Sequence, residues 1–192
     1  MSAGACGAHG DASVEEDLVL RLRRGDSVAL GEAYDAHHAA VRAFARRLLG
    51  DEEEAEDLVQ ETFLALPGAT RGFRGGSALR TFIVGIAIHH ASHHVRAATR
   101  RRAAHARSGR EERSAPASPD EDAHRRELAE ALTRALDELS FDHRVAVVLC
   151  EVEERTAGEA AAIVGAPEAT IRTRIFHAKK RLRAILEGGG FG

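Results

Sequence analysis

Basic and polar side chains gather on one face of a helix that the sequence predicts near the end of the chain. Apolar residues recur there at spacings of three and four, which predicts a buried stripe of Ile171, Ile175, Ala178, Leu182 and Ile185. The opposite face holds the candidate DNA-contacting residues Thr170, Arg172, Thr173, Arg174, Phe176, His177, Lys179 and Lys180. Lys and Arg neutralise phosphates, and polar side chains reach base edges in the major groove. We therefore expect this helix to bind duplex DNA; the alternative is an amphipathic helix with a solvated polar face.

A tight turn precedes this helix. The run at 160–164 is apolar, Gly165 stands where a helix end needs a flexible residue, and Pro167 stands where the next helix would begin. Upstream, Thr156 and Glu159 have the spacing of a capping box, in which each side chain accepts a hydrogen bond from the other residue's backbone amide. Two helices joined by such a corner form a helix-turn-helix, whose second helix enters the major groove.

Four histidines form a second group of residues that could do chemistry. His89 with His93, and His90 with His94, are spaced by four residues, so each pair can chelate a transition metal on one face of a helix. The pair at 37–38 could add ligands from outside. The sequence offers no Cys or carboxylate that completes a tetrahedral set, and no HExxH pattern. We therefore expect no metal and no cofactor, and the four histidines remain the alternative ligand set.

Charge is strongly segregated along the 192 residues. The net charge is only −3, yet acidic side chains crowd 51–61, and Arg residues crowd 96–113 and the final helix. Such a chain suggests two partners, one of them anionic. With 44% hydrophobic and 4% aromatic residues, the chain is better suited to two small helical cores than to one large core.

Several classes of protein are excluded by motifs that the sequence lacks. There is no P-loop, no GxSxG and no GxGxxG after a strand, so we expect a protein that is not an enzyme. Cys6 and Cys150 form no disulfide or metal framework. No apolar run is long enough to cross a membrane or resembles a signal peptide. We expect a soluble cytoplasmic protein without membrane insertion.

The apolar periodicity predicts an all-α fold with two small helical domains joined by a flexible linker. In the first domain, a break near Gly25 separates two helices, a third is expected at 52–66 before Pro67, and a fourth at 78–98 after a capping Ser77. Ser, Pro and charged residues without apolar periodicity indicate the linker. The expected organisation is a disordered tail at 1–13, a four-helix domain at 14–103, a linker at 104–122, a helix-turn-helix domain at 123–187 and a Gly-rich tail at 188–192.

Over roughly residues 16–186, the chain resembles the extracytoplasmic-function (ECF, group 4) sigma factors of the sigma-70 family, which are bacterial transcription initiation subunits. Residues 54–63 resemble the segment that docks on the clamp helices of the polymerase β′ subunit. Residues 73–82 resemble the loop that captures a flipped base of the minus-10 element, and 170–178 resemble the minus-35 recognition helix. The resemblance implies a sigma region 2-like first domain, a sigma region 4-like second domain, and a linker that threads toward the polymerase active centre.

Site residues and partners also follow from the resemblance. The residues implied for core polymerase binding are Glu56, Asp57, Gln60 and Glu61. Those implied for minus-10 recognition and melting are Phe73, Arg74, Ser77, Arg80, Thr81, Phe82, His89, His93 and Arg96. The implied partners are core RNA polymerase (β′ clamp helices and β subunit), promoter DNA, and an anti-sigma factor that could hold the protein at the membrane. The implied function is promoter recognition, promoter melting and direction of transcription initiation.

The chain departs from the family pattern at several positions. These are Phe82 for Trp, Ser140 for Pro, Glu154 and Ala169 for Gly, Ala160 for a larger aliphatic residue, and histidines near 89 and 93 for Asn and Asp. We expect an unusual promoter preference, and we expect His89 to contact the melted minus-10 strand from a polar helix face. Two alternatives stay open: a conventional helix-turn-helix regulator that binds duplex DNA without polymerase, usually as a symmetric dimer, and a His-rich metal-sensing protein.

Overall fold

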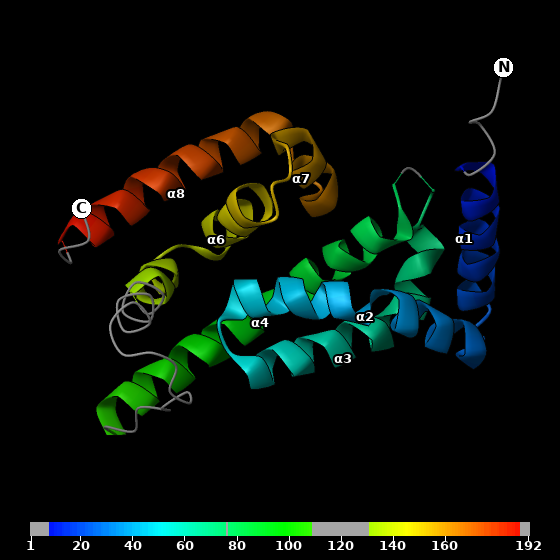
Figure 1. The fold of residues 1–192 in the computed structure, drawn as a ribbon, viewed down its shortest axis with the longest axis horizontal. Helices are drawn as coiled ribbons and strands as arrows, with labels where there is room; N and C mark the ends of the chain where they lie inside the picture. The colour runs from blue at the N-terminus through cyan, green and yellow to red at the C-terminus, as the bar shows by residue number, and fades with distance from the viewer. Residues whose placement is uncertain (1–7, 76, 109–130, 189–192) are drawn as a thin grey trace, which may run out of the picture.

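The computed structural model describes residues 8–75, 77–108 and 131–188, and every regular element in these ranges is helical. The first part comprises α1 (Ala8–Arg23), α2 (Ser27–Leu49), α3 (Glu52–Ala69), the 3-10 turn η1 (Thr70–Gly72) and α4 (Leu79–Ser108). The second part comprises a helical segment at 131–137, α6 (Phe141–Val147), the π-helical η2 (Val148–Val152), α7 (Ala157–Val164) and α8 (Glu168–Gly188) (Figure 1). The prediction of an all-α fold is confirmed.

Helix boundaries in the first part follow local sequence signals. The Asp26 side chain caps α2 by accepting a hydrogen bond from the backbone amide of Val28 at 2.8 Å. The helix ends at Gly50, whose φ of 62° is left-handed and suits a residue without Cβ. Asp51 then accepts a hydrogen bond from the amide of Glu54 at 3.0 Å and starts α3. This short connection lets α3 pack along α2 (Figure 1).

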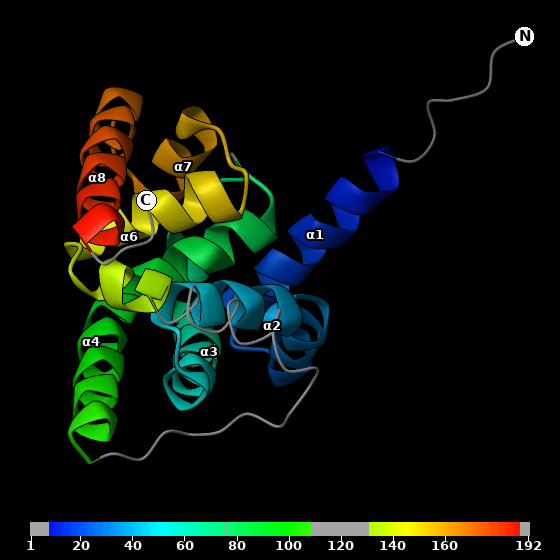
Figure 2. The ribbon, with the colours of Figure 1, turned by 60° about the vertical axis from the view of Figure 1, so that its left-hand side comes forward.

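Two apolar clusters hold the helices together. One lies among α1 to α4 and includes the fully buried Leu22 and Ile83. The other includes Phe44 of α2, Leu149 of η2 and Ile171 of α8, so it belongs to both parts of the chain. As a result α6 and α7 pack on α4, and η2 packs on α2 (Figure 2).

A polar link crosses the same interface. Arg144 of α6 is only 2% exposed, and its guanidinium donates to the backbone carbonyl of Leu48 at 3.2 Å and to the carboxylate of Asp137 at 2.5 Å. Arg102 of α4 donates to the same carboxylate at 2.5 Å and to the carbonyl of Leu49 at 2.6 Å. Asp137 is therefore shared by an arginine from each part of the chain.

Two helices of the first part begin or end outside their predicted bounds. α1 begins at Ala8, inside the expected tail at 1–13. α3 passes through Pro67 instead of ending before it. The proline removes one amide donor, but Thr70 closes the last turn: its amide donates to the Leu66 carbonyl, and its hydroxyl donates to the Pro67 carbonyl at 2.8 Å.

The fourth helix is longer than predicted. α4 continues ten residues beyond Ala98 to Ser108, because the Arg and Ala residues of this stretch are strong helix formers. Residues 104–108, expected to belong to the linker, are therefore helical. The rest of the expected linker, the start of the second domain and most of both expected tails lie outside the described residues.

Candidate functional site

The predicted helix-turn-helix corner is present. The Glu159 carboxylate accepts a hydrogen bond from the Thr156 amide at 2.8 Å, and the Thr156 hydroxyl accepts one from the Glu159 amide at 3.2 Å. These contacts complete the capping box and hold the pKa of Glu159 below its usual value. α7 ends at Gly165, whose φ is 69°, and α8 begins directly after Pro167. The capping-box and turn predictions are confirmed.

α8 presents outward the face that the sequence assigns to DNA. Ile171 and Ala178 of the apolar stripe are buried against α6 and α7. Two of the candidate residues, Thr170 and Arg174, are half-buried. The remaining candidates are all exposed: Arg172, Thr173, Phe176, His177, Lys179 and Lys180. Phe176 is 66% exposed, which gives this face an apolar side chain among its cations.

Carboxylates pair with some cations of this face. Glu168 holds Arg172, Asp142 holds Arg174, and Glu151 holds Lys179. Most of these side chains remain well exposed, and exposed ion pairs contribute only about 0–1 kcal/mol each. A DNA phosphate can therefore replace the carboxylates at little energetic cost.

The loop before α4 encloses a hollow next to α1. Phe73 is 8% exposed, and its ring centroid lies 4.8 Å from that of Phe82. Arg23 of α1 supports the loop by donating hydrogen bonds to backbone carbonyls, including that of Phe73. A cavity of about 630 Å³ lies here, with Arg23, Phe73, Arg74 and Ser77 in its lining. Arg74 and Ser77 are exposed at its edge, whereas Phe73 belongs to the core.

The outward face of α4 lies beside the helix-turn-helix corner. Of the predicted minus-10 residues on this helix, Arg80, His89, His93 and Arg96 are exposed, and Thr81 and Phe82 are half-buried. A Cβ placed on Gly85 would lie 3.1 Å from the carbonyl oxygen of Ile163, so α7 approaches α4 closely at this glycine. A cavity of about 460 Å³ between the two helices has Thr81, His89 and Gly165 in its lining. The corner therefore covers part of the face predicted to contact DNA.

The residues predicted to bind polymerase do not all lie on one exposed face of α3. Asp57 and Gln60 are exposed, and they share one helix face with Leu64, which is 78% exposed. Glu56 is half-buried, and its carboxylate is 2.6 Å from the guanidinium of Arg42. The outward face of α3 thus carries an acidic residue, an amide and a large aliphatic side chain.

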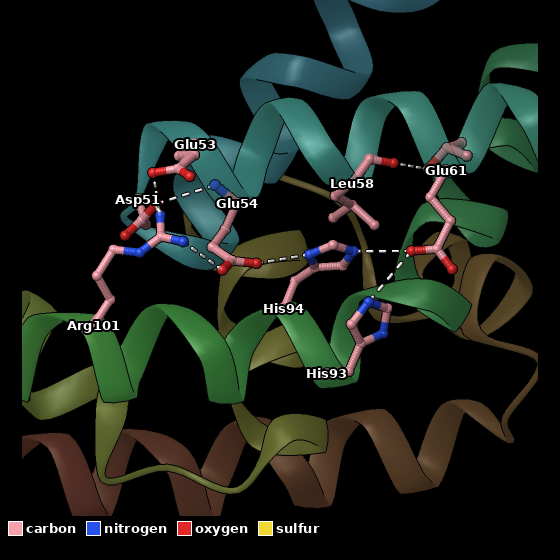
Figure 3. A network of polar contacts seen from close by, with 9 residues as sticks. Asp51, Glu53, Glu54, Leu58, Glu61, His93, His94 and Arg101 are labelled. Carbon is pink, nitrogen blue, oxygen red and sulfur yellow. Dashed lines mark hydrogen bonds and ion pairs between the residues drawn. The ribbon is translucent and has the colours of Figure 1, made fainter.

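Glu61, the fourth residue predicted to bind polymerase, faces the histidines of α4 (Figure 3). Its Oε1 is 2.8 Å from His90 Nδ1, and its Oε2 is 2.9 Å from His94 Nε2 and 3.3 Å from His93 Nε2. Burial would raise the pKa of Glu61, but the hydrogen bonds to His94 and His90 hold it below its usual value. Glu61 thus supplies the carboxylate that sequence reasoning did not find for the histidines. The group that forms is Glu61, His93 and His94, in place of the pairs with a spacing of four.

Two neighbours of this group, Glu54 and Arg101, were not predicted from the sequence. His94 is 5% exposed, and its Nδ1 is 2.8 Å from the carboxylate of Glu54, which is itself buried. Arg101 donates to the other oxygen of Glu54 at 3.0 Å (Figure 3). Glu54 and Glu61 are seven residues apart, as are His94 and Arg101, so each pair lies on one helix face. The equal spacing of seven residues in the two helices is the sequence signal that could have predicted that α3 packs against α4 at these side chains.

The chain is similar to known proteins over nearly its whole length. Family profiles described as Sigma-70 region 2 and Sigma-70, region 4 match residues 33–101 and 129–182. The fold and the helix-turn-helix thus define a sigma factor of the sigma-70 family, a class of non-enzymatic, DNA-binding initiation factors. The ECF RNA polymerase sigma factor SigC of Mycobacterium tuberculosis (strain CDC 1551 / Oshkosh) is 35% identical over 173 residues, which cover 88% of this chain and 90% of the relative. Within that class, the chain belongs to the ECF sigma factors.

Solved structures of two similar proteins include bound partners. The sigma factor RpoE from Bartonella quintana, in complex with the anti-sigma factor NepR, matches with a TM-score of 0.55 and 28% identity over 82% of this chain and 96% of that chain. CnrH, in complex with the cytosolic domain of CnrY, matches with a TM-score of 0.59 and 25% identity over 91% of this chain and 97% of that chain. In the described part of this chain, we find no helix with the length and apolar character needed to span a membrane.

Proposed function

We propose that this ECF sigma factor binds bacterial core RNA polymerase, recognises the minus-35 and minus-10 promoter elements, promotes promoter melting and directs transcription initiation. The observation that carries the proposal is the outward face of α3, formed by Asp57, Gln60 and Leu64. A conventional helix-turn-helix regulator could use the same face only to form its dimer, so binding to core polymerase distinguishes the two functions.

The face of α3 has the composition of a protein-docking surface. Leu64 offers an apolar side chain that is 78% exposed, more than any other large apolar side chain in the described residues, and burying it against a partner is favourable. Asp57 and Gln60 lie beside it and can accept and donate hydrogen bonds. The docking partner we propose is the pair of β′ clamp helices, with further contacts to the β subunit.

We assign minus-35 recognition to α8. The exposed side chains of this helix include Arg172, which can bind a guanine edge with two hydrogen bonds, and Lys180, which suits a phosphate. Each bidentate base contact would discriminate by about 1–3 kcal/mol.

We assign minus-10 recognition to the hollow beside α1 and to the start of α4. Arg74 and Ser77 lie at the edge of the cavity, where they can bind an unpaired base, and the apolar Phe73 ring forms part of its wall. Arg80 and His89 lie on the exposed side of α4 and can follow the melted strand. The energy for melting would come from these contacts to unstacked bases.

We also propose control by an anti-sigma factor. The support is the similarity to RpoE, which was solved in complex with the anti-sigma factor NepR. Because polymerase and promoters lie in the cytoplasm, the proposed role assigns this protein to the same compartment, where an anti-sigma partner could hold it at the membrane.

Run-off transcription with core polymerase tests the proposed function. Transcripts from a set of candidate promoters are measured with and without the protein, and binding to core polymerase is measured separately. We expect promoter-dependent transcripts and core binding, and we expect Asp57→Arg to weaken core binding at least tenfold, which corresponds to about 1.4 kcal/mol.

The matched control is Asp35→Arg, an equal charge reversal at an exposed residue of α2. It should leave core binding within about twofold of the parent, a change well below 1 kcal/mol. Tight binding to duplex DNA together with no binding to core polymerase would refute the proposal and favour the conventional regulator.

A further inference from the structure

Three potential metal-binding atoms converge between α3 and α4. A ring nitrogen of His93, a ring nitrogen of His94 and a carboxylate oxygen of Glu61 all lie within 4.8 Å of one another (Figure 3). Nothing in the assigned roles of α3 and α4 explains why two adjacent imidazoles should face one carboxylate oxygen. The arrangement has the donor types of a transition-metal site.

The protons on His94 leave one of its contacts unexplained. Its Nδ1 is 2.8 Å from Glu54 and its Nε2 is 2.9 Å from Glu61, so both ring nitrogens face carboxylates. A neutral imidazole carries one N–H and can donate to only one of them. The second contact is satisfied by a second proton on the ring, by a proton on one of the two carboxyls, or by a metal ion bound to the ring nitrogen and the carboxylate.

The position of His93 favours the metal ion. Its Nε2 lies 3.3 Å from the same Glu61 oxygen, and its ring centroid lies 3.8 Å from that of His94. A metal ion would take both imidazoles and the carboxylate as ligands at once, whereas a proton accounts only for the contacts of His94. In a tetrahedral zinc site with ligand bonds of about 2.0–2.1 Å, neighbouring ligand atoms are separated by about 3.3 Å. The Glu61 oxygen lies 2.9 Å from His94 Nε2 and 3.3 Å from His93 Nε2, which is near that value.

The surroundings orient the ligands as in established zinc sites. A metal-bound histidine usually donates its other N–H to a carboxylate, which fixes the tautomer and the ring orientation. For His94 that carboxylate is Glu54, which lies next to Nδ1. Arg101 donates a hydrogen bond to the other oxygen of Glu54 at 3.0 Å. His90 holds the second oxygen of Glu61 at 2.8 Å. These contacts hold the side chains of His94 and Glu61 in place before any ion arrives.

We propose that Glu61, His93 and His94 form a binding site for one divalent transition-metal ion of the Zn²⁺ class. Two imidazoles and one carboxylate favour zinc over magnesium or calcium, which prefer oxygen ligands. The His93 side chain is 57% exposed, so the ion can enter from solvent, and water can take the fourth position. The bound ion cross-links α3 to α4. The site is independent of the proposed role in transcription, because binding is measured on the free protein.

The test is a Zn²⁺ titration of the full chain after chelator treatment, with Co²⁺ as a spectroscopic probe. We expect one Zn²⁺ per chain and an intense visible Co²⁺ spectrum of tetrahedral type. His93→Ala and Glu61→Gln should each weaken Zn²⁺ binding at least tenfold. These variants are preferred to a change at the buried His94, because His93 and Glu61 are more exposed and the fold should tolerate their loss.

The matched control is His89→Ala, which removes an exposed histidine of the same helix that lies outside the group. It should bind Zn²⁺ within about twofold of the parent. The absence of saturable Zn²⁺ binding to the parent would overturn the proposal. Equal losses in His93→Ala and His89→Ala would overturn this ligand set.

Discussion

Asp137→Asn removes the negative charge that two arginines share. In the parent, the Asp137 carboxylate accepts hydrogen bonds from Arg144 and Arg102, each at 2.5 Å. Arg144 is only 2% exposed, whereas the Arg102 side chain is 24% exposed. The substitution preserves the shape of the side chain, so its effect reports the charge. It leaves a buried guanidinium without its counter-ion.

The expected loss is about 3–5 kcal/mol, the usual cost of removing one partner from a buried ion pair. Most of it comes from Arg144, because Arg102 retains contact with solvent. A loss of this size is a large share of the roughly 5–15 kcal/mol that stabilises a folded domain. Urea denaturation followed by circular dichroism measures it as a fall in the transition midpoint.

Asp142→Asn is the control for this prediction. It is the same chemical change, but the Asp142 side chain is 58% exposed and pairs with Arg174 at the surface. We expect this control to lose at most about 1 kcal/mol. If Asp137→Asn lost no more than Asp142→Asn, the inference that a buried charge pair joins the two parts of the chain would be wrong.

The free energy of unfolding at acid pH gives a second measurement on Asp137. Burial would raise the pKa of this carboxyl, but the hydrogen bonds from Arg102 and Arg144 outweigh burial and hold the pKa below 3.8. The charged form therefore stabilises the fold above pH 3.8, and this contribution is lost as the pH falls through the lowered pKa. We expect the parent to lose this contribution below pH 3.8 and the Asn variant to have none to lose.

Three further substitutions test single features. Glu154 has a left-handed φ of 55°, so Glu154→Gly should raise the free energy of unfolding by about 0.5–1 kcal/mol; a decrease would contradict backbone strain there. Thr156→Ala removes the capping box and should lower the same quantity by about 1 kcal/mol in thermal denaturation, and an unchanged midpoint would argue against it. Lys180→Ala should weaken promoter binding evenly across sequences and reduce the salt slope by about 1; a sequence-dependent loss would exclude a phosphate contact.

The helix-turn-helix could be predicted from sequence because its signals are local. The capping box needs two residues three apart, and the turn needs Gly165 at a left-handed position. The buried stripe of α8 was likewise readable from its periodicity, and Ile171 and Ala178 are buried as expected. Each signal depends on neighbours within one or two turns of helix, which the sequence alone supplies.

The features that were missed depend on contacts between distant segments. The sequence offered His94 only as an alternative metal ligand paired with His90, yet it is buried between Glu54 and Glu61, some 33–40 residues away in the chain. The shared core of the two parts could not be read either, because Leu149 is apolar in any arrangement and only packing shows that it joins Phe44. Helix length was underestimated for α4, since the composition around Arg101 suits both a linker and a helix.

The close approach of α7 to Gly85 of α4 has a consequence for affinity. A ligand that needs the whole face of α4 binds only the fraction of molecules in which α7 has moved away. Its apparent affinity is the intrinsic affinity multiplied by that fraction. The bound ligand shifts the population toward the open form, in which α7 has moved away from α4. A partner that contacts both parts of the chain while α7 lies against α4 loses no affinity in this way. Its binding lowers the population of the open form. Competing ligands would therefore act in opposite directions on any equilibrium between the observed form, in which the Ile163 carbonyl lies against Gly85, and a form in which α7 has moved away.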